Sequence, residues 1–301
     1  METKKLTKAK KEKNKLVIEI PSRALFNLDL SKQIFKDEGI EAYAKHQQEN
    51  ENVILEPGIG FTLVKKLLQL NSKKTPIDVI LLSRNSADTG LRIFNSIEHY
   101  GLNISRAAFT RGESTHPFVG AFEADLFLSS NYNDVQKALQ SGYAAASIVE
   151  SKSNNSHPSQ LRIAFDGDAV IFSDESERIF QEQGLEAFHE NEKRSENIEL
   201  KAGPFKSFLV SLQKIQSTFP EQNNPIRTAL VTARSAPSHK RVIHTMRKWG
   251  IRIDESFFLG GLEKGIFLRE FAADIFSTTN NSTAIQPHSM FLPVMYPAVL
   301  K

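Results

Sequence analysis

An internal repeat is the feature of this sequence that most constrains its fold. Residues 16–45 align with residues 161–190 at a constant offset of 145, and 10 of the 30 aligned pairs are identical. The match resumes at an offset of 149, where residues 76–90 align with residues 225–239. Self-similarity of this kind predicts that the chain contains two copies of one structural unit.

Each copy alternates short apolar runs with helix-like segments, in the order strand, helical segment, strand, helix, strand, helix, strand. Such alternation predicts a parallel α/β sheet. The repeat divides the chain into a first half, 16–150, and a second half, 161–301, joined by the polar linker 151–160. The sequence leaves open whether the halves form two lobes or one pseudo-symmetric body.

Two carboxylates follow the first apolar run of the second half, where residues 161–165 lead into Asp166, Gly167 and Asp168. Ligands bind at the carboxyl ends of parallel strands, so a binding loop is expected here. Asp166 could attack an electrophile such as phosphorus, while Asp168 could protonate the leaving oxygen and later activate water. Both carboxylates also suit Mg²⁺. A simple turn after a strand is the alternative interpretation.

The two copies differ at this strand end, because the first half has Pro21, Ser22 and Arg23 in place of the aspartates. The first half therefore cannot supply an aspartyl nucleophile from that position. We expect the second half to carry the chemistry and the first to be a degenerate partner that shapes the site or the interface. The alternative is that neither copy is catalytic.

Groups that suit a phosphate follow two further strands of the second half. The run at 228–231 ends at Thr232, a hydroxyl followed by free backbone donors, although a threonine at a strand end is common for structural reasons. Lys264 follows two glycines near an expected helix start and could cancel charge on a phosphoryl group. A solvated surface lysine is the alternative for Lys264.

The order Asp-x-Asp, Thr, Lys at successive strand ends resembles the haloacid dehalogenase superfamily. The strings LRIAFDGDAVIFSDESERIF, VTARSAPSHKRVI, LLSRNSADTGLRIFNSIEHYGL and FFLGGLEKG resemble the cytosolic 5′-nucleotidase I family, and the resemblance covers about residues 16–280. It implies an internally duplicated Rossmannoid fold and Mg²⁺-dependent hydrolysis of nucleoside 5′-monophosphates such as AMP, IMP or GMP through a phosphoaspartate. By position, Asp166 would be the nucleophile, Asp168 the general acid/base, both would hold Mg²⁺, and Thr232, Ala233 and Lys264 would bind phosphate.

The positions after the last expected strand depart from the family pattern. An acidic pair is typical after the last strand, but this chain has Thr278 and Thr279 there. Because those acids hold magnesium, their loss is expected to weaken metal affinity or abolish turnover. Asp274 lies nearby, but Asp125 occupies the same place in the first half, so Asp274 is interpreted as structural. Asp166, one backbone carbonyl, waters and a substrate phosphate are a sufficient alternative ligand set, because magnesium often keeps several waters.

A longer insertion, about residues 175–206, lies between Asp168 and Thr232 and suits a small helical cap over the strand ends. The candidates for substrate contacts are Phe188, His189, Phe205, Lys206, Arg234 and Ser235. For the two phenylalanines, core packing is the alternative.

Composition narrows the function classes. No apolar run approaches the roughly 20 residues of a membrane helix, and the absence of cysteine excludes disulfides and thiolate metal sites. Residues 1–15 carry seven lysines against two glutamates, which leaves the remainder slightly acidic, so a disordered solubilising tail is expected. We expect a cytoplasmic protein with a nucleoside monophosphate substrate and neither nucleic acid nor membrane as partner. The sequence leaves homo-oligomerisation open.

Two other functions stay open. A non-enzymatic nucleotide-binding protein is favoured by the missing acidic pair and predicts binding without phosphate release. A phosphatase of the same chemistry for another phosphomonoester is the second, which a substrate panel would separate.

Overall fold

The computed structural model describes residues 15–72, 76–115, 117–149 and 157–278, and nine strands form one sheet within them. The strands of the first half are β1 (Leu16–Pro21), β2 (Ile77–Ser83), β3 (Arg106–Phe109), β4 (Leu126–Ser129) and β5 (Ala145–Ile148). Those of the second half are β6 (Leu161–Phe165), β7 (Ile226–Thr232), β8 (Glu255–Phe258) and β9 (Ile275–Ser277). Residues 1–14 of the expected tail and most of the linker lie outside the described residues.

Helices connect these strands. In the first half they are α1 (Ser22–Leu25), α2 (Asp29–Glu49), α3 (Phe61–Gln69), α4 (Leu91–His99), α5 (Pro117–Ala121) and α6 (Tyr132–Gln140). In the second half they are η2 (Gly167–Ile171), α7 (Glu175–Arg194), α8 (Lys206–Gln216), η3 (Glu221–Asn223), α9 (His239–Trp249) and α10 (Lys264–Glu270). Among the described residues, none of the helices combines the length and the apolar character needed to cross a membrane.

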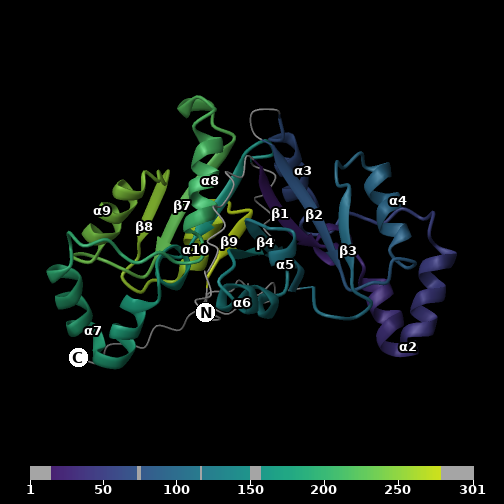
Figure 1. Cartoon of the computed structure of the whole chain (residues 1–301), viewed down its shortest axis with the longest axis horizontal. Helices are drawn as coiled ribbons and strands as arrows, with labels where there is room; N and C mark the ends of the chain where they lie inside the picture. Colours follow the sequence, from purple (N-terminus) through teal and green to yellow (C-terminus); the bar gives the residue numbers. More distant parts are fainter. Residues whose placement is uncertain (1–14, 73–75, 116, 150–156, 279–301) are drawn as a thin grey trace, which may run out of the picture.

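The strand order is β3-β2-β1-β4-β5-β9-β6-β7-β8, and all neighbours are parallel except β5 and β9, which run antiparallel. The predicted α/β class with a mostly parallel sheet is therefore confirmed. The halves share one continuous sheet rather than forming separate lobes (Figure 1). The repeat does not predict α6 and β5, which complete the first half and bring β5 against β9.

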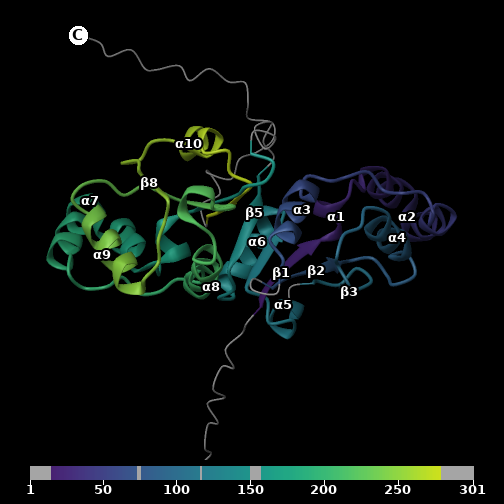
Figure 2. The ribbon, with the colours of Figure 1, turned by 90° about the horizontal axis from the view of Figure 1, so that it is seen from above.

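Both faces of the sheet are covered by helices, with α8 and α10 on opposite sides of the second-half strands (Figure 2). Parallel strands buried on both faces require continuous apolar runs, and β1, β2 and β6 are buried over almost their whole length. One apolar cluster includes side chains from both halves, among them Leu67, Ile163, Leu212 and Ile275. The two halves therefore bury a common core.

A buried ion pair also links the halves. The Lys66 ammonium of α3 lies 2.7 Å from Oδ1 of Asp274, while Oδ2 of Asp274 accepts a hydrogen bond from the backbone N–H of Arg162. Asp125 accepts the equivalent bond from Val17 in the first half. These contacts agree with the structural interpretation of Asp274.

The expected cap segment folds mainly as α7, which bends at Gly184, where φ is 84°. Its first-half counterpart α2 bends at Gly39, where φ is 89°. Only glycine adopts this backbone conformation without strain. The two bent helices lie at opposite ends of the molecule (Figure 1).

Candidate active site

Asp166 lies at the carboxyl end of β6, where its side chain is buried and both of its oxygens accept hydrogen bonds. Oδ2 accepts hydrogen bonds from Nζ of Lys264 at 2.5 Å and from Oγ1 of Thr278 at 2.9 Å, and Oδ1 accepts one from the N–H of Gly167 at 2.8 Å. Burial raises the pKa of Asp166, and the neighbouring Lys264 ammonium opposes that rise. Residues from β6, α10 and the end of β9 therefore converge on one carboxylate.

Lys264 is a buried partner of Asp166, not the solvated surface lysine that was the alternative. It is the first residue of α10 and is 7% exposed. A cation at this depth is expected to have an anionic partner, which Asp166 provides. Its place beside the candidate nucleophile suits contact with a phosphoryl oxygen.

Thr232 ends β7, the strand next to β6, and lies beside the Asp166 loop. A Cβ at Gly167 would lie 3.0 Å from the Thr232 hydroxyl, a tight contact that a larger residue could make only if Thr232 shifted slightly. The same hydroxyl accepts a hydrogen bond from the N–H of Arg234 at 3.2 Å. Ala233 follows Thr232 after the end of β7 and is exposed.

Asp168 does not point freely into solvent, because Arg234 holds both of its oxygens. Nε of Arg234 lies 2.8 Å from Oδ2 and Nη2 lies 2.7 Å from Oδ1. The remaining Nη1 lies 2.5 Å from Oε2 of Glu192, a buried residue of α7. Burial opposes the charge of Arg234, but the two carboxylates outweigh it and raise the pKa of the guanidinium.

The other predicted contact residues divide into core and periphery. Phe205 is fully buried against Phe165 and Phe208, which favours core packing. Phe188 is 8% exposed and lies under the Arg234 guanidinium, with 5.3 Å between the guanidinium carbon and the ring centroid.

Three candidates remain at the periphery. His189 lies beside the Phe188 ring, Lys206 lies over Trp249, and Ser235 is half-buried after Arg234. Thr279 lies outside the described residues.

The donor chemistry of the site fits magnesium in part. Among the described residues, no group of three or more His, Cys, Asp or Glu side chains is placed to hold a metal ion. Asp166 provides a buried hard oxygen donor, and Mg²⁺ commonly uses one or two carboxylates together with substrate phosphate and water. Each oxygen of Asp168 accepts a hydrogen bond from Arg234, so as a ligand Asp168 would share an oxygen between Arg234 and the metal. Thr278 donates to Asp166, so it offers a neutral hydroxyl in place of an acid.

Three residues of the site were missed by sequence reasoning: Glu192, Arg241 and Ser176. Oε1 of Glu192 accepts hydrogen bonds from Nη1 of Arg241 and from Oγ of Ser176, both at 2.9 Å. None of the three belongs to a motif. The repeat alignment contains a signal, because it pairs Glu192 with Gln47 and Arg241 with Arg92.

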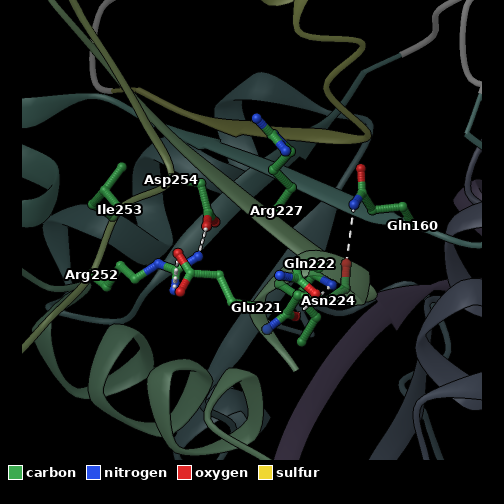
Figure 3. A pocket seen from close by; sticks show the side chains of 9 residues that line it. Gln160, Glu221, Gln222, Asn224, Arg227, Arg252, Ile253 and Asp254 are labelled. Atoms are coloured by element: carbon green, nitrogen blue, oxygen red, sulfur yellow. Dashed lines mark hydrogen bonds and ion pairs between the residues drawn. The ribbon is translucent and has the colours of Figure 1, made fainter. Parts of the chain in front are cut away.

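A separate polar pocket of about 280 Å³ lies at the opposite edge of the sheet (Figure 3). It is lined by residues at the amino ends of β6, β7 and β8, including Gln160, Arg227 and Asp254. Because Asp166 lies at the carboxyl end of β6, this pocket is not the candidate active site.

A buried aspartate, a hydroxyl and a lysine at the carboxyl ends of parallel strands define the class: an α/β protein with a candidate site for a phosphoryl group. The family model described as 5′-nucleotidase matches residues 8–294. The chain is also 40% identical over 280 residues to cytosolic 5′-nucleotidase 1B of Homo sapiens. The aligned region covers 88% of this chain and 46% of the human protein. The chain therefore belongs to the 5′-nucleotidase family, as its sequence strings predict.

The chain spans a little under half the length of this curated relative. No solved structure is significantly similar to it.

Proposed function

We propose that this chain hydrolyses nucleoside 5′-monophosphates, of the AMP, IMP or GMP type, to nucleoside and inorganic phosphate. The observation that carries the proposal is the placement of Asp166, buried at the end of β6 with Lys264 and Thr278 on one of its oxygens. Membership in the 5′-nucleotidase family supports the substrate class. A cytoplasmic location is part of the proposal, supported by the name of the human relative.

The proposed reaction has two steps. In the first, an oxygen of Asp166 attacks phosphorus and the bond to the 5′ oxygen breaks, while Asp168 gives its proton to that oxygen and nucleoside leaves. In the second, Asp168 removes a proton from water as the water attacks the aspartyl-phosphate, which frees inorganic phosphate and restores Asp166. Lys264 neutralises charge on the phosphoryl oxygens throughout.

Magnesium belongs to this proposal as a resident cofactor, with Asp166 and Asp168 as its protein ligands. When bound, it would supply positive charge to the phosphoryl oxygens. Thr232 and the backbone of Ala233 are proposed to bind the phosphate, because the Thr232 hydroxyl at the end of β7 lies beside Gly167 and Ala233 follows it directly.

A haloacid dehalogenase-like, internally duplicated fold is the architectural part of the proposal. Several hydrogen bonds recur at aligned positions in both halves. Nε of Arg92 donates to Val53 O at 2.8 Å, as Nε of Arg241 donates to Ile198 O at 2.9 Å. The pairing of Leu55 N with Ser96 Oγ likewise matches that of Leu200 N with Thr245 Oγ1, both at 3.0 Å.

A nucleotide-binding protein without turnover is the second candidate. It is favoured by one observation: Thr278 brings a hydroxyl to a position that is typically acidic in the family. Such a protein would bind a nucleoside monophosphate without releasing phosphate.

The deciding experiment measures phosphate release from AMP, IMP, GMP and their deoxy counterparts, with and without Mg²⁺, for wild type and Asp166→Asn. We expect Mg²⁺-dependent release by wild type and a loss of at least about 1,000-fold in the variant, since the nucleophile is removed. Silent wild type whose melting temperature rises with nucleotide would instead support the binding protein. Release from other phosphomonoesters only would support the broader phosphatase.

A further inference from the structure

A chain of buried ion pairs connects Asp168 to helix α7. Arg234 contacts both oxygens of Asp168, at 2.7 and 2.8 Å, and contacts Glu192 with its remaining nitrogen at 2.5 Å. Arg234 is 4% exposed and Glu192 is 1% exposed. At this depth the charge of each group depends on its partners. We call this set the Asp168–Arg234–Glu192 chain.

Glu192 is itself fixed at its far side. Its second oxygen accepts hydrogen bonds from Arg241 of α9 and from Ser176 of α7. Phe188, one turn before Glu192 on α7, lies against the Arg234 guanidinium. The orientation of Arg234 is therefore determined largely by α7.

The first half provides an internal comparison for the anchoring part of this arrangement. Gln47 stands where the second half has Glu192, and Nη1 of Arg92 donates to it at 3.3 Å, as Nη1 of Arg241 donates to Glu192. The bent helix α2 and its contact with Arg92 of α4 thus form with a neutral glutamine. The negative charge of Glu192 is not needed to build this part of the fold.

The ion pairs of Arg234 with Asp168 and Glu192 occur only in the half that has the aspartate pair. Arg23 and Asn85 stand in the first half at the positions of Asp168 and Arg234. Burying a carboxylate and a guanidinium costs desolvation energy that an apolar or neutral pair avoids. The second half carries this cost at the side chains that lead to Asp168, while the aligned first-half positions hold Gln47 and Asn85, which indicates a role in the site.

We propose that Glu192 and Arg234 are positioning residues, through which helix α7 sets the orientation of the Asp168 carboxyl group. The proposal rests on the proposed function, in which Asp168 protonates the leaving oxygen and activates water. Both steps need the carboxyl group within hydrogen-bond reach of a reacting atom. The paired nitrogens of a guanidinium fix the plane of a carboxylate, which a single ammonium does not.

The first test replaces Glu192 by Gln, the residue that the first half already uses at this position. Wild type, Glu192→Gln and the mirror variant Gln47→Glu are compared in phosphate release and thermal unfolding. We expect Glu192→Gln to lower kcat at least about tenfold, with KM within about twofold of wild type, because only the reacting geometry is disturbed. Its melting temperature should stay within about 4 °C, and Gln47→Glu should leave kcat unchanged.

Arg234→Lys extends the test by keeping the charge and removing the two-nitrogen contact. It should lower kcat as Glu192→Gln does, and the double variant should lose little more than either single variant, because the residues act as one unit. Unchanged kcat in Glu192→Gln, or a rise in KM alone, overturns the proposal. Equal losses in Glu192→Gln and Gln47→Glu also overturn it, because they indicate a structural role.

A readout that does not need activity separates this inference from the proposed function. Amide hydrogen exchange of residues 167–173 should be faster in Glu192→Gln than in wild type and unchanged in Gln47→Glu, because Arg234, the partner of Asp168, loses its ion pair with Glu192. If wild type releases no phosphate, the proposed function fails while this comparison still decides the link between α7 and Asp168. Unchanged exchange in Glu192→Gln overturns the link.

Discussion

At the residue scale, the site depends on which partner each carboxylate has. Asp166 faces an ammonium and two neutral donors, whereas Asp168 faces a guanidinium. An ammonium is a compact point charge that can also contact a phosphoryl oxygen. A guanidinium is planar and rigid and binds a carboxylate through two nitrogens. In the proposed reaction, these partners suit Asp166 to attack on phosphorus and Asp168 to directed proton transfer.

Lys264→Met tests this difference through stability as well as activity. Without the ammonium, Asp166 is a buried carboxylate that retains only neutral donors, so we expect a loss of about 3 kcal/mol in the free energy of unfolding. Phosphate release should fall at least about 100-fold, since the phosphoryl charge also loses its partner. Urea unfolding and steady-state kinetics measure the two effects.

The double variant Asp166→Asn with Lys264→Met removes both charges and should regain most of the lost stability. Lys248→Met, at an exposed lysine of α9, is the control and should change neither quantity. A double variant no more stable than Lys264→Met would show that the stability of the site does not depend on this charge pair.

The candidate site was predictable only where its residues follow strands. Asp166 follows β6, Thr232 ends β7 and Lys264 begins α10, so local patterns place them at one sheet edge. Glu192 lies inside a polar helix, and only the bend at Gly184 and the packing of α7 bring it to Arg234. Thr278 was expected as the loss of an acid, and its hydrogen bond to Asp166 needed three-dimensional structure.

At the element scale, the bent helices α2 and α7 are equivalent in shape but not in what they carry. Their bends lie at Gly39 and Gly184, with nearly the same backbone angles, and a Cβ added at either glycine would have no atom within 4 Å. A side chain there meets backbone strain but no steric clash. The pair therefore separates the effect of the bend from the effect of α7 on the site.

Alanine at either glycine should lower the free energy of unfolding by about 2 kcal/mol, as measured in urea. Only Gly184→Ala should also lower kcat, because α7 carries Glu192 and Phe188, which contact Arg234. Gly39→Ala is the matched control of the same chemistry. Similar kcat values in the two variants would separate the bend of α7 from the orientation of Asp168.

At the scale of the whole molecule, the first half contacts residues next to the candidate site of the second half, where β5 and α6 lie against β9 and Thr278. The repeat predicted the two halves and their alternation, but not that α6 and β5 would pair them edge to edge. That pairing depends on residues 132–149, which follow the last segment of the repeat alignment and have no aligned counterpart in it. Ser277 of β9 donates to Ala145 O of β5 at 2.6 Å, and Nε2 of Gln136 on α6 donates to Thr278 O at 2.9 Å.

Gln136 therefore supports a second-half residue that donates directly to Asp166. Gln136→Met keeps the length of the side chain and removes the hydrogen bond to Thr278 O, which weakens the placement of the Thr278 hydroxyl. We expect kcat to fall about fivefold and the free energy of unfolding by about 1 kcal/mol, the value of one such hydrogen bond. Gln140→Met, at an exposed position of the same helix, should leave both unchanged. If Gln136→Met lowers stability but leaves kcat at the wild-type value, the first half supports the fold without shaping the site. A fall in kcat would instead show that the first half, which has no aspartyl nucleophile, still contributes to the reaction.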